Sequence, residues 1–374
     1  MDSLSPLLPL VLGPLLITAL TVPIVKRLAW RYNLVDRPET GAHKSHQQPT
    51  PYGGAVAIVG GLLLTLHVAL PYLVPLLQQQ AIAMNSVWLM DLVVASADFI
   101  HRGADLALVL AGGITLFLLG LADDWRGLPP LFRFSAQLLI VAAVVGLLPA
   151  CRLPLFPDAP YLNMALTVLW ITAMSNAFNF LDNMDGLSAG ISAICLVFLA
   201  FMALLARDFG LATFCLALFG ALCGFLLYNL PPASIFMGDA GGLFLGYCVA
   251  AVTVMLSQTY AHATLFAAHQ LAPLLVLAVP LYDFASVNLI RIRTGSKPWV
   301  GDKNHISHRL VRLGLSRQNA VLAIYLVTTL TGLPALLALR FDELSWLAVG
   351  PLLIAIAAIA DRISYRAPEA SGPG

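Results

Sequence analysis

Apolar residues fill most of this chain in runs of about 17 to 25 residues, and polar residues gather between the runs. Because a bilayer core of about 30 Å needs about 20 apolar helical residues for each crossing, each run is long enough to span a membrane. The pattern predicts an all-α, polytopic integral membrane protein, with one domain over residues 1–374 and about eleven transmembrane helices. The expected ranges are 5–25, 53–77, 104–122, 134–150, 162–180, 187–206, 210–228, 241–258, 266–290, 319–339 and 345–361.

The composition agrees with this pattern. Hydrophobic residues make up 59% of the chain and charged residues 10%, and the mean hydropathy is +0.86. An ordinary soluble domain carries roughly 25% charged residues. The net charge of +1 gives no electrostatic basis for binding nucleic acid, so no nucleic-acid partner is expected.

Lysine and arginine are distributed unequally between the two sides of the predicted membrane domain. Sixteen of the 20 lie in the loops 26–52, 123–133, 181–186, 229–240 and 291–318 or after residue 361. By the positive-inside rule these segments are cytoplasmic, which predicts a plasma (inner) membrane protein with its N-terminus outside and its C-terminus in the cytoplasm. Segment 78–105 fits two alternatives, a short helix lying on the outer membrane face or a solvated loop.

Six aspartates lie at the cytoplasmic ends of the predicted helices: Asp123, Asp124, Asp182, Asp185, Asp239 and Asp283. A single aspartate there is explained as a solvated helix end. Carboxylates at helix C-termini face the negative end of the helix dipole, and ionisable groups at membrane depth usually mark a functional site. Six of them on one side need a cation between them, and oxygen ligands favour Mg²⁺ or Mn²⁺ bound together with substrate phosphates.

Glycines and a basic loop add the features of a phosphate site. "GDAGG" (238–242) flanks Asp239 and precedes a predicted helix, so backbone N–H groups and a helix N-terminus can approach a diphosphate. The loop 291–317 is rich in Arg and Lys, which suits either phosphate or anionic lipid head groups. His305 and His308 share one face of a helical turn, and because no third soft ligand is near, substrate contact is favoured over zinc.

The stretch "NAFNFLDNMDGLSAG" (176–190) places polar side chains at every third position. In a helix such a ladder winds around the axis, and Gly186 predicts that the helix ends near it. We expect Asn176 to be structural, and Asn179, Asp182 and Asp185 to reach a nucleotide-sugar.

Six motifs follow one another along the chain: "HKSHQQPTPYGG" (43–54), "LGLADD" (119–124), "NAFNFLDNMDGLSAG" (176–190), "FMGDAGG" (236–242), "PLYD" (280–283) and "HISHRL" (305–310). In these motifs the chain resembles the polyprenyl-phosphate N-acetylhexosamine-1-phosphate transferase family over nearly its whole length. The resemblance implies Mg²⁺-dependent transfer of a sugar-1-phosphate from a UDP-N-acetylhexosamine to a polyprenyl phosphate lipid, which releases UMP. It also implies about ten or eleven transmembrane helices with a cytoplasm-facing active-site cleft.

The resemblance also implies roles for single residues. The metal ligands are Asp239 and Asp123, and the catalytic residues are Asp123, Asp124, Asp182 and His305. The substrate-binding residues are Lys44, Asn179, Asp185, Phe236, Arg291 and His308, with Phe236 packing on uracil.

Two departures from the family pattern bear on the donor sugar. Ser307 stands where the UDP-GlcNAc branch often has histidine, and the three consecutive histidines typical of the UDP-MurNAc-pentapeptide branch are absent. The undecaprenyl-phosphate GlcNAc-1-phosphate transferase branch, which opens a cell-envelope glycan pathway, is therefore favoured. In the first cytoplasmic loop His43 stands where arginine is common. The oligomeric state stays open, with a homodimer as one alternative.

Two other functions remain as alternatives. A transporter or flippase for an anionic lipid or sugar phosphate predicts ionisable residues near mid-span and inverted repeats, whereas the acids here lie at one side and no repeat is visible. A membrane scaffold leaves the acid and glycine loops unexplained.

The chemistry itself argues against a general base. A phosphate monoester is mostly a dianion at pH 7, because its second pKa is near 6. We therefore hypothesise that Asp123 and Asp124 mainly position a metal ion or basic residues.

Overall fold

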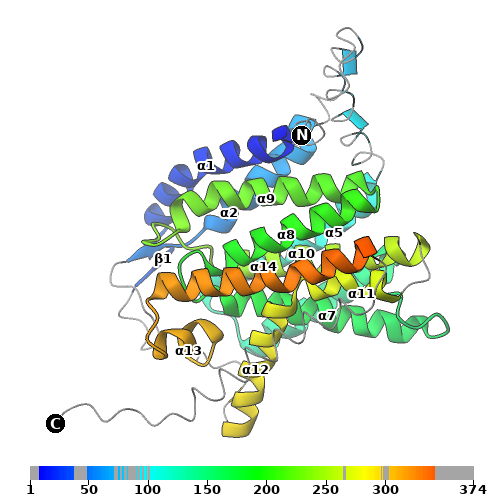
Figure 1. Ribbon diagram of the computed structural model, residues 1–374. Coiled ribbons are helices and arrows are strands. Elements are labelled where there is room, and N and C mark those ends of the chain that lie inside the picture. The colour runs from blue at the N-terminus through cyan, green and yellow to red at the C-terminus, as the bar shows by residue number, and fades with distance from the viewer. Residues whose placement is uncertain are drawn as a thin grey trace.

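The computed structural model describes residues 8–37, 49–70, 102–263, 267–295, 297 and 303–341, together with single positions between 75 and 99. Within these residues the protein is almost entirely helical, and most of the long helices run side by side in one bundle (Figure 1). Lys44, most of segment 78–105 and the expected span 345–361 lie outside the described residues.

Eight described helices are long and apolar enough to cross a membrane. They are α1 (Leu8–Arg31), α5 (Gly103–Arg126), α6 (Pro130–Leu147), α7 (Pro160–Leu181), α8 (Leu187–Leu205), α9 (Phe209–Asn229), α10 (Asp239–Ala263) and α14 (Arg317–Phe341). Each corresponds to an expected span, so the all-α polytopic fold is confirmed. The total of eleven stays a prediction, because the described residues do not cover every expected span.

The expected span 266–290 is not one continuous helix. The structure divides it into α11 (Ala267–Leu275) and α12 (Ala278–Thr294), which are bent by 62° at the break. Pro280 explains the position of the break, because it has no N–H to continue the helical hydrogen bonds from the preceding turn. In Figure 1 α12 consequently runs across the direction of its neighbours and toward the end that carries α13 (Ile306–Arg312).

A short pair of strands lies at the same end of the bundle as α13 (Figure 1). Strand β1 (Val35–Asp36) pairs antiparallel with β2 (Thr50–Pro51), and the hydropathy pattern did not indicate this pair. Helix α2 (Gly54–Leu63) follows β2 and continues into a π-helical turn, η3 (Leu64–Ala69). The short 3₁₀ turn η4 (Pro149–Cys151) precedes α7.

Helix α10 forms the centre of the bundle and packs against α5, α7, α8 and α11. Glycines allow the closest of these contacts. A Cβ on Gly120 would lie 2.5 Å from Ala240 Cα, and one on Gly246 would lie 2.6 Å from the Met174 carbonyl oxygen. Since both obstacles are backbone atoms, larger side chains would push α5 and α7 away from α10.

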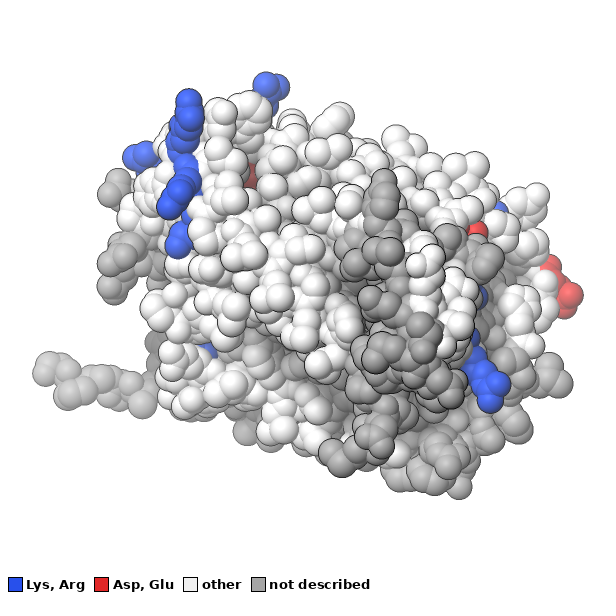
Figure 2. Space-filling view, turned by 90° about the horizontal axis from the view of Figure 1, so that it is seen from above, with Lys and Arg blue, Asp and Glu red and all other residues white. Residues whose placement is uncertain are grey.

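The outer surface is that of a membrane protein. Leucines such as Leu12, Leu16 and Leu20 are exposed along α1. Figure 2 shows most of the visible basic side chains toward one end of the molecule, a few basic and acidic ones at the other end, and a broad surface with very few charged side chains between them. An exposed apolar band of this kind suits contact with lipid rather than water.

Candidate active site

Three helices bring the predicted acids to one end of the bundle. Asp123 and Asp124 lie in the last turn of α5, Asp182 directly follows α7, and Asp239 is the first residue of α10. Gly238 makes the close approach possible, because its φ of 81° suits glycine and a Cβ there would lie 2.5 Å from Asp124 Oδ2. The aspartates predicted from three separate motifs therefore converge.

Asp124 caps the central helix. Its Oδ1 accepts the backbone N–H of Asp239 at 2.8 Å, and its Oδ2 accepts the N–H of Ala240 at 3.1 Å. These are free N–H groups of the first turn of α10, so the carboxylate satisfies them and faces the positive end of the helix dipole. Asp124 thus fixes the position of Asp239 relative to α5.

Arg133, in the first turn of α6, lies between Asp123 and Asp239. One guanidinium nitrogen, Nη1, donates to Oδ2 of both carboxylates. The other oxygen of Asp123 accepts the Leu128 N–H at 2.6 Å. The sequence pattern gave Arg133 a role only in membrane orientation. No local signal distinguishes this arginine, because the positive-inside rule alone explains a basic residue ten positions after Asp123.

The end of α7 supplies the next polar groups. Oδ1 of Asn179 is buried without a hydrogen-bond partner, and it lies where a Cβ on Gly242 would meet it at 2.5 Å. Burial raises the pKa of Asp182 to about 7, and the charges of Asp239 and Asp185 act in the same direction while the Gly238 N–H opposes them. The half-buried Asp182 therefore needs a cation to stay fully ionised at neutral pH.

The other two members of the polar ladder, Asn176 and Asp185, form hydrogen bonds within the protein. Asn176 is buried and donates from Nδ2 to Gln137 Oε1 at 2.6 Å and to the Thr172 carbonyl at 2.8 Å, in line with the structural role expected for it. Asp185 accepts the Ala233 N–H at 2.9 Å and so ties the loop before α8 to the loop before α10. Helix α7 ends at Leu181, five residues before the expected break at Gly186.

An aromatic pair lies next to the start of α10. Phe236 donates its N–H to the Pro51 carbonyl at 2.9 Å, and the Gly54 N–H donates to the Phe236 carbonyl at 2.9 Å. The Phe236 ring faces Tyr52, with 6.3 Å between the ring centroids and 52° between the planes. Tyr52 was not identified as a site residue, although it lies within the "HKSHQQPTPYGG" motif.

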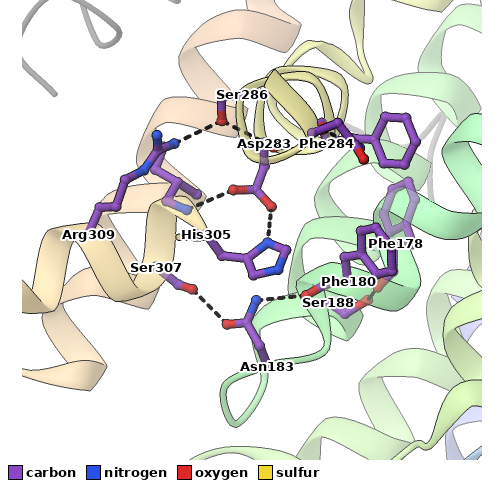
Figure 3. A network of polar contacts seen from close by, with 12 residues as sticks. Phe178, Phe180, Asn183, Ser188, Asp283, Phe284, Ser286, His305, Ser307 and Arg309 are labelled. Carbon is purple, nitrogen blue, oxygen red and sulfur yellow. Dashed lines mark hydrogen bonds and ion pairs between the residues drawn. The ribbon is translucent and has the colours of Figure 1, made fainter. Parts of the chain in front are cut away.

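A second polar network joins α12, α13 and the loop after α7 (Figure 3). His305 Nδ1 lies 2.7 Å from Asp283 Oδ2, and the Ile306 N–H donates to Asp283 Oδ1 at 2.7 Å. The nearly buried Arg291 places its guanidinium 5.2 Å from the centre of the Phe180 ring, which lies edge-on to His305. Because Phe180 directly follows Asn179, the two networks meet at the end of α7.

Ser307 and His308 have different environments on α13. Ser307 is fully buried and donates to Asn183 Oδ1 at 2.6 Å, so the departure from histidine at this position serves a link between α13 and the loop after α7. Burial lowers the pKa of His308 to about 4, and the neighbouring positive charges, beginning with His305 and Lys303, act in the same direction. His308 is therefore neutral at pH 7.

The donor atoms suit a divalent cation. Among the described residues no group of three His, Cys, Asp or Glu side chains gathers as a metal site. Mg²⁺ commonly uses one or two carboxylates and completes its shell with water and substrate phosphates. Asp123 and Asp239 already share one cation, Arg133, and Asn179 offers an unpartnered oxygen beside them. This all-oxygen set fits Mg²⁺ better than a softer metal.

Comparison with known proteins identifies the family of the chain. The model of the family described as glycosyl transferase family 4 matches residues 106–257, which carry all the aspartates of the first network. The chain belongs to this family and, within it, to the polyprenyl-phosphate N-acetylhexosamine-1-phosphate transferases.

Several curated relatives resemble the chain over most of its length. It is 32% identical to a probable undecaprenyl-phosphate N-acetylglucosaminyl 1-phosphate transferase of Bacillus subtilis, over 84% of this chain and 79% of that protein. It is 31% identical to the decaprenyl-phosphate N-acetylglucosaminephosphotransferase of Mycolicibacterium smegmatis, over 87% and 80%. An Escherichia coli undecaprenyl-phosphate alpha-N-acetylglucosaminyl 1-phosphate transferase is 26% identical, over 84% and 79%.

Proposed function

We propose that this chain transfers GlcNAc-1-phosphate from UDP-GlcNAc to undecaprenyl phosphate or a similar polyprenyl phosphate. The products are UMP and a polyprenyl diphosphate-sugar, the first membrane-bound intermediate of a cell-envelope glycan. The observation that carries the proposal is the convergence of Asp123, Asp182 and Asp239 at one end of a membrane bundle, where a single arginine pairs with Asp123 and Asp239 and the charge of Asp239 acts on Asp182. The names of the relatives support GlcNAc as the sugar.

The physical task is to join two anions. An oxygen of the lipid phosphate attacks the sugar-bearing phosphorus of the UDP-sugar, the bond from that phosphorus to the bridging oxygen breaks, and UMP leaves with the bond electrons. Catalysis of this step rests on positioning and on neutralisation of charge. Mg²⁺, when bound by Asp123, Asp239 and Asn179, supplies positive charge to the diphosphate.

The residues of the chain then have separate tasks. Asp124 holds the N-terminus of α10 in place, and Arg133 provides a cation next to the metal ligands. Phe236, steadied by its backbone bonds to the β2 segment, offers its ring to uracil beside Tyr52. Arg291 and His305 stand on the far side of Phe180, where they contact donor phosphate.

The contacts of the paired aspartates support positioning over base catalysis. Both oxygens of Asp123 accept hydrogen bonds, and so do both oxygens of Asp124. A fully hydrogen-bonded carboxylate is a weak base. Asp123→Asn distinguishes the two roles. Under the positioning role, UMP release stays low at all pH values, whereas recovery above pH 8, where the acceptor is fully ionised, would establish a base.

The direct test is release of UMP by the purified protein with undecaprenyl phosphate and Mg²⁺. We expect release with UDP-GlcNAc, less with other UDP-N-acetylhexosamines, and none in the presence of a chelator. No UMP from any donor in this panel would refute the enzyme and favour the transporter alternative. That alternative requires ionisable groups near mid-span, whereas the described site acids lie at helix ends.

The proposed setting is the plasma membrane, with the N-terminus outside and the site and C-terminus in the cytoplasm. Labelling of single cysteines introduced into the loop after α5 and the loop after α8 tests this orientation, because only the second is expected to react from outside the cell. A homodimer stays one alternative for the assembly, and native mass spectrometry in detergent decides it.

A further inference from the structure

The proposed reaction leaves the Asp283 carboxylate without a task. Asp283 lies on α12 and is fully buried, and His305 at the start of α13 is 5% exposed. Burying a carboxylate is costly unless hydrogen bonds or a charge compensate it. Here both oxygens are used, Oδ2 by the His305 ring and Oδ1 by the Ile306 N–H, each at 2.7 Å (Figure 3).

The contact between Asp283 and His305 assigns the hydrogen of the ring. Oδ1 of Asp283 accepts the Ile306 N–H, and with Oδ2 as an acceptor too, Nδ1 of His305 is the donor of this pair. Among the described residues Nε2 of His305 has no hydrogen-bond partner, which leaves it as the ring nitrogen open to another group.

The surroundings fix the ring as well as its hydrogen. The edge of the ring meets Phe180, 5.9 Å between centroids, and Phe180 stacks on Phe284 of α12 at 6.0 Å. Because Oδ1 of Asp283 caps the first N–H of α13, the same carboxylate sets both the helix start and the orientation of the imidazole.

We infer that Asp283 is a positioning residue for His305: it holds Nδ1 protonated and turns Nε2 toward the anionic part of the bound donor. The inference rests on the proposed function for the identity of that anion. With Nδ1 bonded to Asp283, Nε2 is the nitrogen that can carry a proton to a phosphate oxygen and form a charge-assisted hydrogen bond with it.

The substitution Asp283→Asn tests whether Asp283 acts through His305, because asparagine has nearly the same shape as aspartate. The asparagine keeps one oxygen for the Ile306 N–H, but its amide nitrogen is a donor and no longer accepts from Nδ1. We expect UMP release to fall roughly 100-fold, a typical effect of disabling one proton-bearing group. His305→Gln should cost about as much, and the double variant should lose no more than about threefold beyond either single one. Losses that multiply in the double variant would overturn the inference.

Nitrogen NMR of protein labelled in histidine gives a readout that a purely structural role would not move. His305 is assigned from the signals that vanish in His305→Gln. At about pH 8, where an ordinary histidine is neutral, Nδ1 should carry the hydrogen in the parent protein and lose it in Asp283→Asn. Ser307→Ala is the matched control, because it removes a 2.6 Å hydrogen bond from the same helix without touching the ring, and the His305 signals should stay unchanged.

The NMR result separates this inference from the proposed function. If no donor yields UMP but Nδ1 of His305 is protonated in the parent, the positioning inference stands and the reaction is wrong. An unprotonated Nδ1 in the parent protein would overturn the inference even if Asp283→Asn fails to fold.

Discussion

The two ends of the helix bundle treat their carboxylates differently. In the loop between α8 and α9, Asp208 accepts the Leu211 N–H at 3.1 Å and caps α9. It also accepts from the Thr259 hydroxyl at 3.2 Å and pairs with Arg102 at 2.9 Å. One carboxylate there has a cation of its own, so the structure accounts for it without a ligand.

At the opposite end, Asp123 and Asp239 share Arg133, and Asp182 lies close enough for the charge of Asp239 to raise its pKa. Negative charge therefore exceeds positive charge among the described groups of this network. The ratio of carboxylates to cations, rather than burial or helix position, therefore distinguishes a structural aspartate from an aspartate that can bind a cationic ligand.

The largest expected effect comes from neutralising one acid at each end. Asp239→Asn should reduce UMP release roughly 1,000-fold, because the site loses a fixed charge that holds the cation on the diphosphate. Asp208→Asn should lower the unfolding temperature but keep UMP release within about threefold per folded molecule. Equal losses of activity in the two variants, measured at matched amounts of folded protein, would remove the distinction between the two ends.

Arg133 provides the next test, because it is the cation that the acids share. Arg133→Gln should lower the free energy of unfolding by about 1–2 kcal/mol in a chelator, less than for a fully buried pair because the Asp239 side chain is 36% exposed. Added Mg²⁺ should raise the unfolding temperature more in this variant than in the parent, since it replaces the missing charge. Arg133→Lys is the control that keeps the charge, and an equal Mg²⁺ shift in all three proteins contradicts the shared-cation view.

Only some glycines in the bundle allow close contact between helices, and substitution of two of them by alanine tests this difference. Gly242→Ala should cost about 1–3 kcal/mol of stability, because its Cβ would lie 2.5 Å from Asn179 Oδ1 and 2.6 Å from Asn179 Cα. Gly146→Ala, near the end of α6, has nothing within 4 Å of the new Cβ and should be neutral or stabilising. Thermal unfolding of the two variants in the same detergent measures the difference.

Hydropathy and charge patterning predicted much of this architecture. The apolar runs located the eight long helices, because bilayer thickness sets their length. Six aspartates at helix ends were expected to converge, and Asp123, Asp124, Asp182 and Asp239 do so. Asp185 instead accepts the Ala233 N–H, and Asp283 belongs to the second network with His305. Both predictions need only local sequence. The apolar runs give the order of the membrane crossings, and because successive helices cross in opposite directions, that order decides which helix ends lie on the same side.

The remaining features depend on contacts between distant residues. Arg133 meets Asp239 across 106 positions, and no local pattern distinguishes it from an arginine that only obeys the positive-inside rule. Asp283 meets His305 across 22 positions, which requires the bent α11–α12 pair. Ser307 departs from a sequence motif, and its structural role could not be predicted because its hydrogen-bond partner, Asn183, lies in another loop.

The smallest expected effect concerns His308, which lies near the site but outside both carboxylate networks. Its pKa of about 4 is below the ordinary value of 6.5, so between these pH values the unfolded chain binds a proton that the folded chain does not. Stability therefore falls as the pH falls from about 6.5 toward 4. His305, Lys303, Arg312 and Arg317 provide the positive charges that oppose protonation. His308→Gln should reduce the loss of stability between about pH 7 and pH 5 by about 0.5 kcal/mol, a value discounted because the ring is only half-buried. Thermal unfolding across this range measures it, and parallel curves for parent and variant would assign the acid sensitivity to the carboxylates instead.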